Sequence, residues 1–222
     1  MIDKLRSNIT HFADTHKIHL LLVSIIILVF LPPFLTELPN FTDSFIKLDF
    51  LMILIACYLI IRKVKSSRFI GYITFILVII DAFLESDILN YIGQLGISYM
   101  VIHAFTLVLK EAMSLQGDTK NLILVSITGY LIIGLIGGFL SAGLEYIYPN
   151  SYSHSADIVF DLYTFIYYSF VTMTTLGYGD MIPITQKAQA LALMMVISGQ
   201  LFLSVIIAIN IAKFMQKKKP NV

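Results

Sequence analysis

Apolar runs of helix length, separated by short polar segments, make up most of the chain. A membrane-spanning helix needs roughly 20 mostly apolar residues to cross about 30 Å of hydrocarbon. Six runs approach or exceed that length, and a further run at about 160–173 is too short to span. The pattern predicts an all-α membrane protein with six transmembrane helices and one short re-entrant helix, which enters the membrane without crossing it. The six runs cover about residues 18–36, 46–62, 69–84, 88–109, 121–146 and 187–214.

The composition agrees with this prediction. Hydrophobic residues make up 58% of the chain and charged residues only 13%, against about 25% charged residues in a soluble domain. The single cysteine, Cys57, lies inside the second run and excludes a disulfide within the chain. We therefore expect membrane lipids, and no nucleic acid, among the partners.

The distribution of the basic residues predicts the orientation of the chain in the membrane. If both termini are cytoplasmic, the inner segments hold 13 of the 15 lysines and arginines. Only Lys47 and Lys187 then fall outside, which is the asymmetry of the positive-inside rule. The sequence therefore predicts a multi-pass protein of the cell (plasma) membrane with both termini in the cytoplasm.

One turn divides the chain. The triplet Gln116-Gly117-Asp118 is the only plausible boundary between a peripheral block and the remainder. It predicts a four-helix peripheral domain followed by a domain that contains the short helix. The predicted divisions are a cytoplasmic segment at 1–17, the peripheral domain at 18–113, the second domain at 114–215 and a cytoplasmic tail at 216–222.

The stretch Thr174–Asp180 stands out between the short apolar run and the last long one. Two glycines alternate with a tyrosine, a threonine pair precedes them and an acid follows. Extended backbone at membrane depth is tolerated only where it is buried in protein or lines a water-filled path. Glycines at alternate positions permit dihedral angles that point successive carbonyls the same way. A ring of such carbonyls could replace the hydration shell of a cation.

The stretch resembles the signature filter of potassium channels, T-V-G-Y-G-D, with Leu176 where valine is commoner. The resemblance extends from Tyr167 through Pro183 and implies a channel of the pore-loop, voltage-gated-like, six-transmembrane superfamily. The resemblance implies the mechanism of potassium channels, in which rings of backbone carbonyls replace the hydration shell of the ion. Because one chain supplies a single filter strand, the resemblance also implies a homotetramer.

The resemblance assigns the filter to five consecutive residues and the outer mouth to Asp180, which would form an acidic ring that concentrates cations. A tyrosine at the position of Tyr178 favours potassium over sodium. Potassium ions, and no other cofactor, are expected at the hydroxyl and carbonyl of Thr175 and at the next three carbonyls. The filter residues are Thr175, Leu176, Gly177, Tyr178 and Gly179.

Three residues are expected to support the filter: Tyr168, Val171 and Thr174. In the family, an aromatic residue at the position of Tyr168 braces the filter tyrosine from behind. Val171 replaces a glutamate that pairs with the filter aspartate in some bacterial relatives. Asp180 must therefore find another partner or stay hydrated.

The last apolar run is expected to form the inner helix. Resemblance places a gating hinge at Gly199, and helical spacing from it puts Gln200, Leu203, Ile207 and Ile211 on one face that lines the cavity and gate. Asn210 could face either the pore or a neighbouring helix. The fifth run carries the small-xxx-small pair Gly134 and Gly138, which lets helices approach closely but leaves the partner open.

The fourth run resembles a voltage-sensing helix in position but lacks its arginines, and its first basic residue is Lys110. We therefore expect gating that depends weakly on voltage or not at all. An alternative is a voltage- or pH-gated potassium channel that uses His103, Asp49 or Asp81, because intramembrane ionisable residues are functional candidates. A lone histidine in such a run is more often a neutral packed side chain.

Two other classes are less compatible with the sequence. An ion uptake transporter subunit would carry several degenerate pore loops in one chain, and only one such loop is present. An enzyme is not expected, because the chain has no His-Glu-x-x-His motif and its one cysteine lies in an apolar run.

Overall fold

The structure is a computed structural model that describes residues 18–35, 39–61, 69, 71–77, 80, 87–113, 119–154 and 161–217. Contacts divide the chain into two compact units, Met1–Gly117 and Asp118–Val222. The predicted boundary at the turn 116–118 lies outside the described residues, and the predicted domain division stays a prediction.

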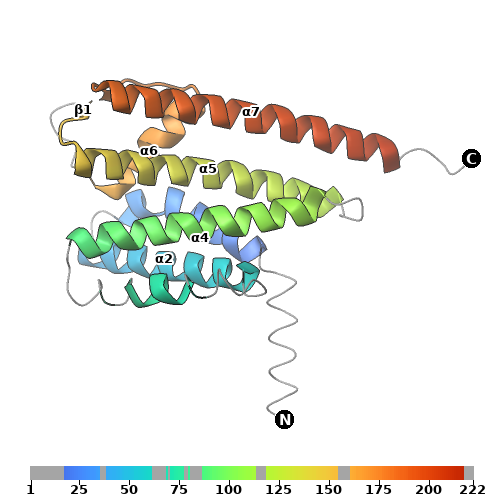
Figure 1. The fold of residues 1–222 in the computed structure, drawn as a ribbon, viewed down its shortest axis with the longest axis horizontal. Helices are drawn as coiled ribbons and strands as arrows, with labels where there is room; N and C mark the ends of the chain where they lie inside the picture. Colours follow the sequence, from blue (N-terminus) through green and yellow to red (C-terminus); the bar gives the residue numbers. More distant parts are fainter. Residues whose placement is uncertain are drawn as a thin grey trace, which may run out of the picture. The chain divides into compact units, whose positions relative to one another are not determined.

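The first unit is helical throughout its described part (Figure 1). It contains a helix at Ile18–Phe30, the 3-10 helix η1 (Pro32–Leu35), α2 (Pro39–Ile61), a helical segment at 71–77 and α4 (Asp87–Met113). The predicted run at 18–36 is thus not one continuous α-helix. Prolines lack the N–H that a helix interior needs, so the pair at 32–33 ends the first helix.

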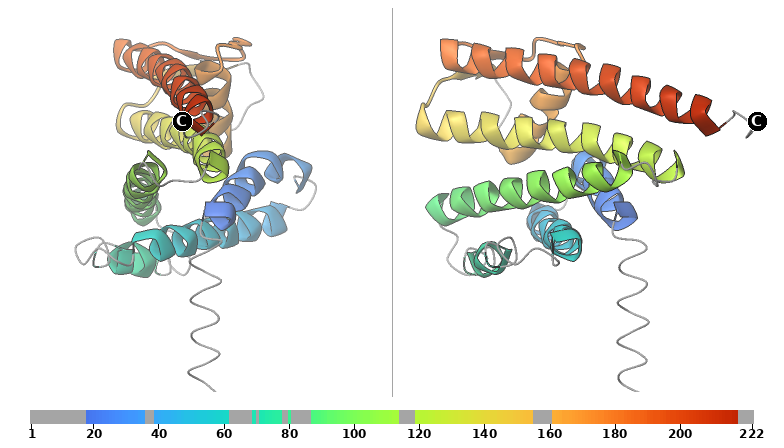
Figure 2. Two further views of the ribbon diagram at one scale, coloured as in Figure 1. Left: turned by 90° about the vertical axis from the view of Figure 1, so that its right-hand side faces the viewer. Right: turned by 45° about the vertical axis from the view of Figure 1, so that its right-hand side comes forward.

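The second unit contains α5 (Thr119–Ile147), β1 (Tyr152–His154), α6 (Leu162–Met173), β2 (Met181–Pro183) and α7 (Gln186–Lys217). Figure 2 shows α5 and α7 running side by side with the short α6 packed against both. The two strands form an antiparallel pair. This pair joins the segment that follows α5 to the segment that precedes α7.

Two helices in the described part of the chain are long and apolar enough to cross a membrane, and both belong to the second unit. They are Leu122–Ile147 in α5 and Gln186–Met215 in α7. Shorter apolar helical stretches lie at Ile18–Phe30, Leu48–Ile61 and Gly96–Leu107. The mostly helical fold is therefore as predicted, whereas the full set of six spans stays a prediction and its third span falls partly outside the described residues.

The glycines of α5 contact α6, so α6 is the packing partner that the sequence left open. A Cβ atom placed on Gly138 would lie 2.8 Å from the Cα atom of Ile166. One placed on Gly134 would lie 2.5 Å from the ring of Phe170. The Ser169 hydroxyl donates to the Gly134 carbonyl across the same contact (2.7 Å). The short helix therefore lies directly against the backbone of α5.

Candidate functional site

Helix α6 is fixed at both ends by side-chain hydrogen bonds. Asp161 caps its first turn, because Oδ1 accepts from the backbone N–H and the hydroxyl of Thr164, both at 2.7 Å. The carboxylate also stabilises the positive end of the helix dipole. At the other end, the hydroxyl of Thr174 donates to the Phe170 carbonyl at 2.7 Å. The helix therefore ends where the candidate filter begins.

The candidate filter folds back onto the last turn of α6. The carbonyl of Val171 accepts two backbone N–H groups, from Leu176 at 3.0 Å and from Gly177 at 3.2 Å. Thr175 donates its N–H to the Thr172 carbonyl at 3.0 Å. Val171 thus holds the filter through its carbonyl, while its side chain is buried.

The backbone of the candidate filter alternates in handedness. Thr175, Gly177 and Gly179 have φ angles of 62°, 58° and 81°, whereas the intervening Leu176 and Tyr178 are outside this region. Residues of opposite handedness in alternation rotate successive peptide planes so that their carbonyls face one side. Glycine adopts positive φ without strain, but threonine does so at a cost that is typical of functional sites.

One copy of the chain leaves the candidate filter open. The side chains of Leu176 and Tyr178 are 56% and 66% exposed. A Cβ atom placed on Gly177 or Gly179 would meet no other group within 4 Å. The second unit therefore presents this segment at its surface and does not enclose it.

Asp180, the residue after the candidate filter, has a partner that the sequence did not identify. The hydroxyl of Tyr167 donates to Oδ2 of Asp180 at 2.8 Å, and the backbone N–H of Met181 donates to Oδ1 at 3.1 Å. Tyr167 and Tyr168 are adjacent in α6, and spacing alone could not tell which of the two reaches the acid.

This contact gives a first prediction. Replacing Tyr167 with Phe keeps the ring and removes the hydroxyl, so the Asp180 carboxylate loses a hydrogen bond. We expect the free energy of unfolding to fall by about 1–2 kcal/mol per chain, because hydrogen bonds to charged groups contribute about 1.5–3 kcal/mol and this one is partly exposed. A double-mutant cycle with Asp180→Asn, measured on detergent-induced unfolding, reports the coupling. A coupling energy near zero would show that the contact does not stabilise the segment that follows the candidate filter.

Tyr168 occupies a different place from Tyr167. It is buried in a core cluster, where its ring packs edge-to-face on Tyr152 of β1 with a centroid distance of 5.2 Å. Burial raises the pKa of the Tyr152 hydroxyl to about 12. The predicted bracing of Tyr178 by Tyr168 stays a prediction.

A single carboxylate near the C-terminal end of α5 binds the segment that leads into β1. Glu145 accepts the backbone N–H groups of Asn150 at 2.7 Å, Ser151 at 2.9 Å and Tyr152 at 3.2 Å. Because β1 pairs with β2, this carboxylate also fixes the segment that follows Asp180.

Gly199 of α7 makes room for the last residue of α6. A Cβ atom placed on Gly199 would lie 2.4 Å from Cγ of Met173. The next residue, Gln200, donates from Nε2 to the Met173 carbonyl at 3.3 Å. Helix α7 runs without interruption through this position, so the predicted hinge at Gly199 stays a prediction.

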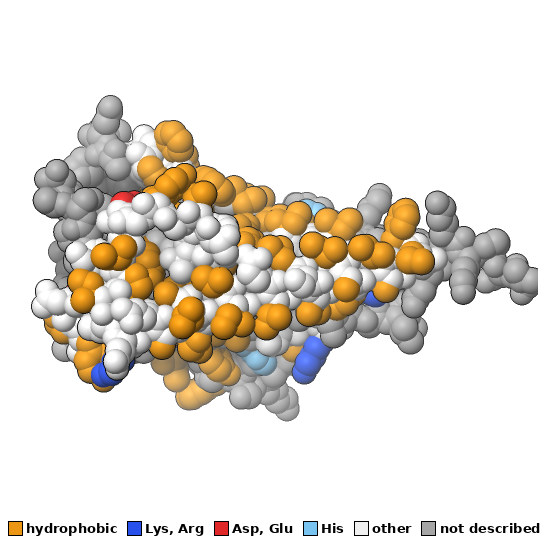
Figure 3. All heavy atoms as spheres, turned by 90° about the horizontal axis from the view of Figure 1, so that it is seen from above, with side chains coloured by type: hydrophobic (Ala, Val, Ile, Leu, Met, Phe, Trp, Pro, Cys, Tyr) orange, Lys and Arg blue, Asp and Glu red, His pale blue; other side chains and the backbone are white. Residues whose placement is uncertain are grey.

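The predicted cavity face of α7 lies mostly at the surface of a single copy. Gln200, Ile207 and Ile211 are exposed and Leu203 is half-buried. Figure 3 shows a row of apolar side chains along this side of the molecule. Asn210 instead points to α5, because its Nδ2 donates to the Ser126 hydroxyl at 3.3 Å.

The ionisable candidates of the first unit do not form a cluster in the described residues. Asp49 is 2% exposed, and neither carboxylate oxygen has a hydrogen-bond partner in that part of the chain. His103 is half-buried and stacks on Tyr99 at a centroid distance of 6.1 Å. Asp81 lies outside the described residues. Among the residues that the structure covers, no group of three His, Cys, Asp or Glu side chains could hold a metal ion.

The second unit thus combines two helices of membrane-spanning length, a short helix between them and an open carbonyl-bearing segment, which is the architecture of a pore region. Residues 125–217 match the family model of ion channels. The match includes all of α6 and α7, the candidate filter and most of α5. It supports an ion channel in a membrane, and it favours ion transport over enzymatic activity. No curated protein matches the chain.

Proposed function

We propose that the protein is a potassium-selective channel that conducts passively through the carbonyls of Thr175 to Tyr178. The observation that carries the proposal is the alternation of positive φ at Thr175, Gly177 and Gly179, directly after the end of α6. This conformation suits a column of carbonyls that takes over the hydration shell of a potassium ion. Asp180 concentrates cations at the outer mouth.

Four copies complete the conduction path. One chain contributes one filter strand, and that strand is open in a single copy. The apolar surface of α7 also needs a cover, either from lipid or from other copies. In the proposed homotetramer, Gln200 and Leu203 line the cavity, Ile207 and Ile211 form a hydrophobic constriction that gates by dewetting, and Gly199 is the hinge.

Opening depends weakly on voltage in this proposal. A gating charge that crosses the membrane field supplies about 2.3 kcal/mol per 100 mV. Helix α4 carries its basic residue, Lys110, in its last turn and has no arginine. It therefore offers no series of charges for the field to move.

Recording from the purified protein in planar bilayers tests the proposal. We expect currents that reverse near the potassium equilibrium potential when sodium replaces potassium on one side. The open probability should change little between −100 and +100 mV, values that span about 4.6 kcal/mol for each moved charge. Equal permeability to sodium and potassium contradicts the filter assignment, and a steep voltage dependence contradicts the assignment of α4.

A further inference from the structure

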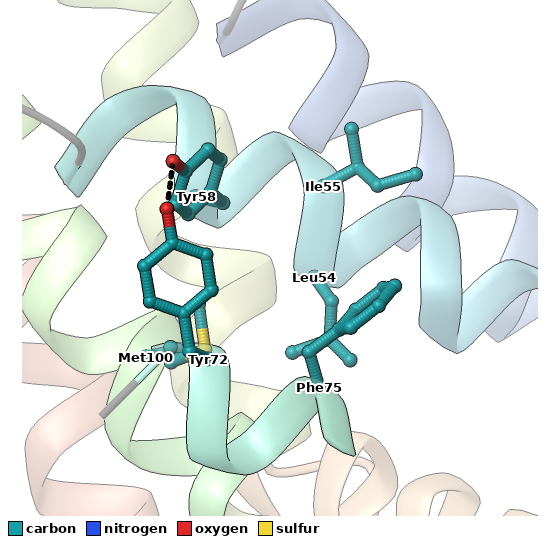
Figure 4. Close-up of a pocket in the computed structure, with 7 residues that line it drawn as sticks. Leu54, Ile55, Tyr58, Tyr72, Phe75 and Met100 are labelled. Carbon is teal, nitrogen blue, oxygen red and sulfur yellow. Dashed lines mark hydrogen bonds between the residues drawn. The ribbon is translucent and has the colours of Figure 1, made fainter. Parts of the chain in front are cut away.

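The first unit contains a cavity of about 260 Å³ between α2, the helical segment 71–77 and α4 (Figure 4). Its walls are almost entirely apolar. The volume is slightly below the range of about 300–1,000 Å³ that is typical for whole small-molecule ligands. The cavity therefore suits a segment of a flexible chain better than a compact ligand. Its labelled walls are Leu54, Ile55, Tyr58, Tyr72, Phe75 and Met100.

The two hydroxyl groups in the wall bond to each other. The hydroxyls of Tyr58 and Tyr72 are 3.0 Å apart, and the two rings are in contact with a centroid distance of 5.7 Å. Figure 4 shows this pair at one end of the cavity. Because each hydroxyl already has the other as a partner, the wall does not require a polar group from an occupant.

The cavity has a buried floor and an open rim. Leu54 and Met100 are 2% and 1% exposed, whereas Ile55, Tyr72 and Phe75 are between 39% and 53% exposed. Gly71 keeps the floor deep, because a Cβ atom there would lie 3.3 Å from Cε of Met100. The open rim belongs to the apolar runs at 46–62 and 69–84, which the sequence predicts to span the membrane.

We propose that this cavity binds one acyl chain of a membrane lipid. The inference rests on the proposed function, because only a membrane-embedded first unit turns the rim toward hydrocarbon. The apolar wall, the mutually bonded tyrosine hydroxyls and the lateral opening all fit a hydrocarbon tail. A lipid headgroup would require polar partners that this wall does not offer.

Photolabelling in nanodiscs tests the inference on the intact protein. One phosphatidylcholine probe carries a diazirine in the middle of its acyl chain, and the other carries it on the headgroup. We expect the mid-chain probe to label Ile55, Tyr72 and Phe75 saturably and several-fold more than Met52, an exposed apolar residue of α2 outside the cavity. The headgroup probe should not label these three residues. Equal labelling of the rim and Met52 would overturn the inference, because the rim would then meet acyl chains no more than any exposed apolar surface does.

A filling variant with a matched control extends the test. Ile55→Trp places a large ring at the rim and should reduce labelling of Tyr72 and Phe75 at least several-fold. Met52→Trp adds the same ring three residues earlier on α2 and should leave that labelling unchanged. Equal labelling in the two variants would contradict the inference. Should Ile55→Trp fail to fold, the comparison of the two probes on the unaltered protein still decides the question.

The same nanodisc preparation separates this inference from the proposed function. Potassium flux without labelling of the rim contradicts the lipid site alone. Labelling of the rim without potassium-selective flux contradicts the channel proposal alone.

Discussion

Replacing Gly177 with Ala is expected to abolish potassium flux while leaving the protein folded. Gly177 has a φ of 58°, and an added Cβ would meet no neighbouring group within 4 Å. The substitution therefore acts through the backbone, where an L-residue in the left-handed region costs about 1–2 kcal/mol. Over four copies this is about 4–8 kcal/mol against the conducting conformation, which corresponds to a loss of flux of roughly a thousandfold or more.

The measurement is potassium flux from proteoliposomes that contain equal amounts of assembled protein. Leu176→Val is the matched control, because it changes a neighbouring filter residue that does not have positive φ. We expect this control to retain flux within about tenfold of the unaltered protein. If Gly177→Ala also stays in that range, Gly177 does not belong to the conduction path.

The second large effect is expected at Gly138 of α5. A side chain there would collide with the backbone of α6, since a Cβ atom would lie 2.8 Å from Cα and 3.1 Å from N of Ile166. A backbone neighbour cannot rotate away, so Gly138→Val forces the two helices apart. Overpacking of this kind typically costs about 1–3 kcal/mol. We expect the loss in folding free energy to lie at or above the upper end of this range. The fraction of protein that assembles into oligomers should fall as a result.

Native mass spectrometry of the purified protein measures that fraction. Leu140→Val is the control, because it introduces the same β-branched residue two positions later, at a side chain that is 45% exposed. Should both variants assemble equally well, the contact between Gly138 and α6 would not limit folding. A selective loss with Gly138→Val supports the packing described here.

The second unit could be predicted closely from sequence because its signals are local. The runs at 121–146 and 187–214 became α5 and α7, and the short run at 160–173 became α6 with a difference of two residues at its start. Glycines at alternate positions directly indicated backbone that is neither helix nor ordinary strand. The positive φ of Thr175 could not be predicted, because a threonine, unlike a glycine, does not indicate this conformation.

Contacts between residues far apart in the chain could not be predicted from the sequence. The hydrogen bond from Tyr167 to Asp180 depends on how the filter folds back, and nothing in the tyrosine pair identifies which ring reaches the acid. The small residues of α5 predicted a close helix contact but not that α6 would fill it. The pairing of β1 with β2 joins two three-residue segments that carry no pattern of their own.

The first unit was harder to predict because few residues mark clearly where its apolar helices begin and end. The first run was expected to continue to residue 36, whereas the structure has a separate 3-10 helix at Pro32–Leu35. The second run was expected from residue 46, whereas α2 begins at Pro39. Proline is favoured at the first position of a helix, where its missing N–H costs nothing. The sequence had placed it outside the run.

The contact between Met173 and Gly199 joins the end of α6 to the middle of α7. Met173 is the last residue of α6, two residues before Thr175, and its side chain occupies the space that a Cβ on Gly199 would fill. In the proposed channel, a bend of α7 at Gly199 would therefore alter the support of the proposed ion site at Thr175. Thermodynamic linkage makes such an effect reciprocal. In the proposed channel, potassium occupancy of the filter should bias the inner helix as strongly as the inner helix biases that occupancy.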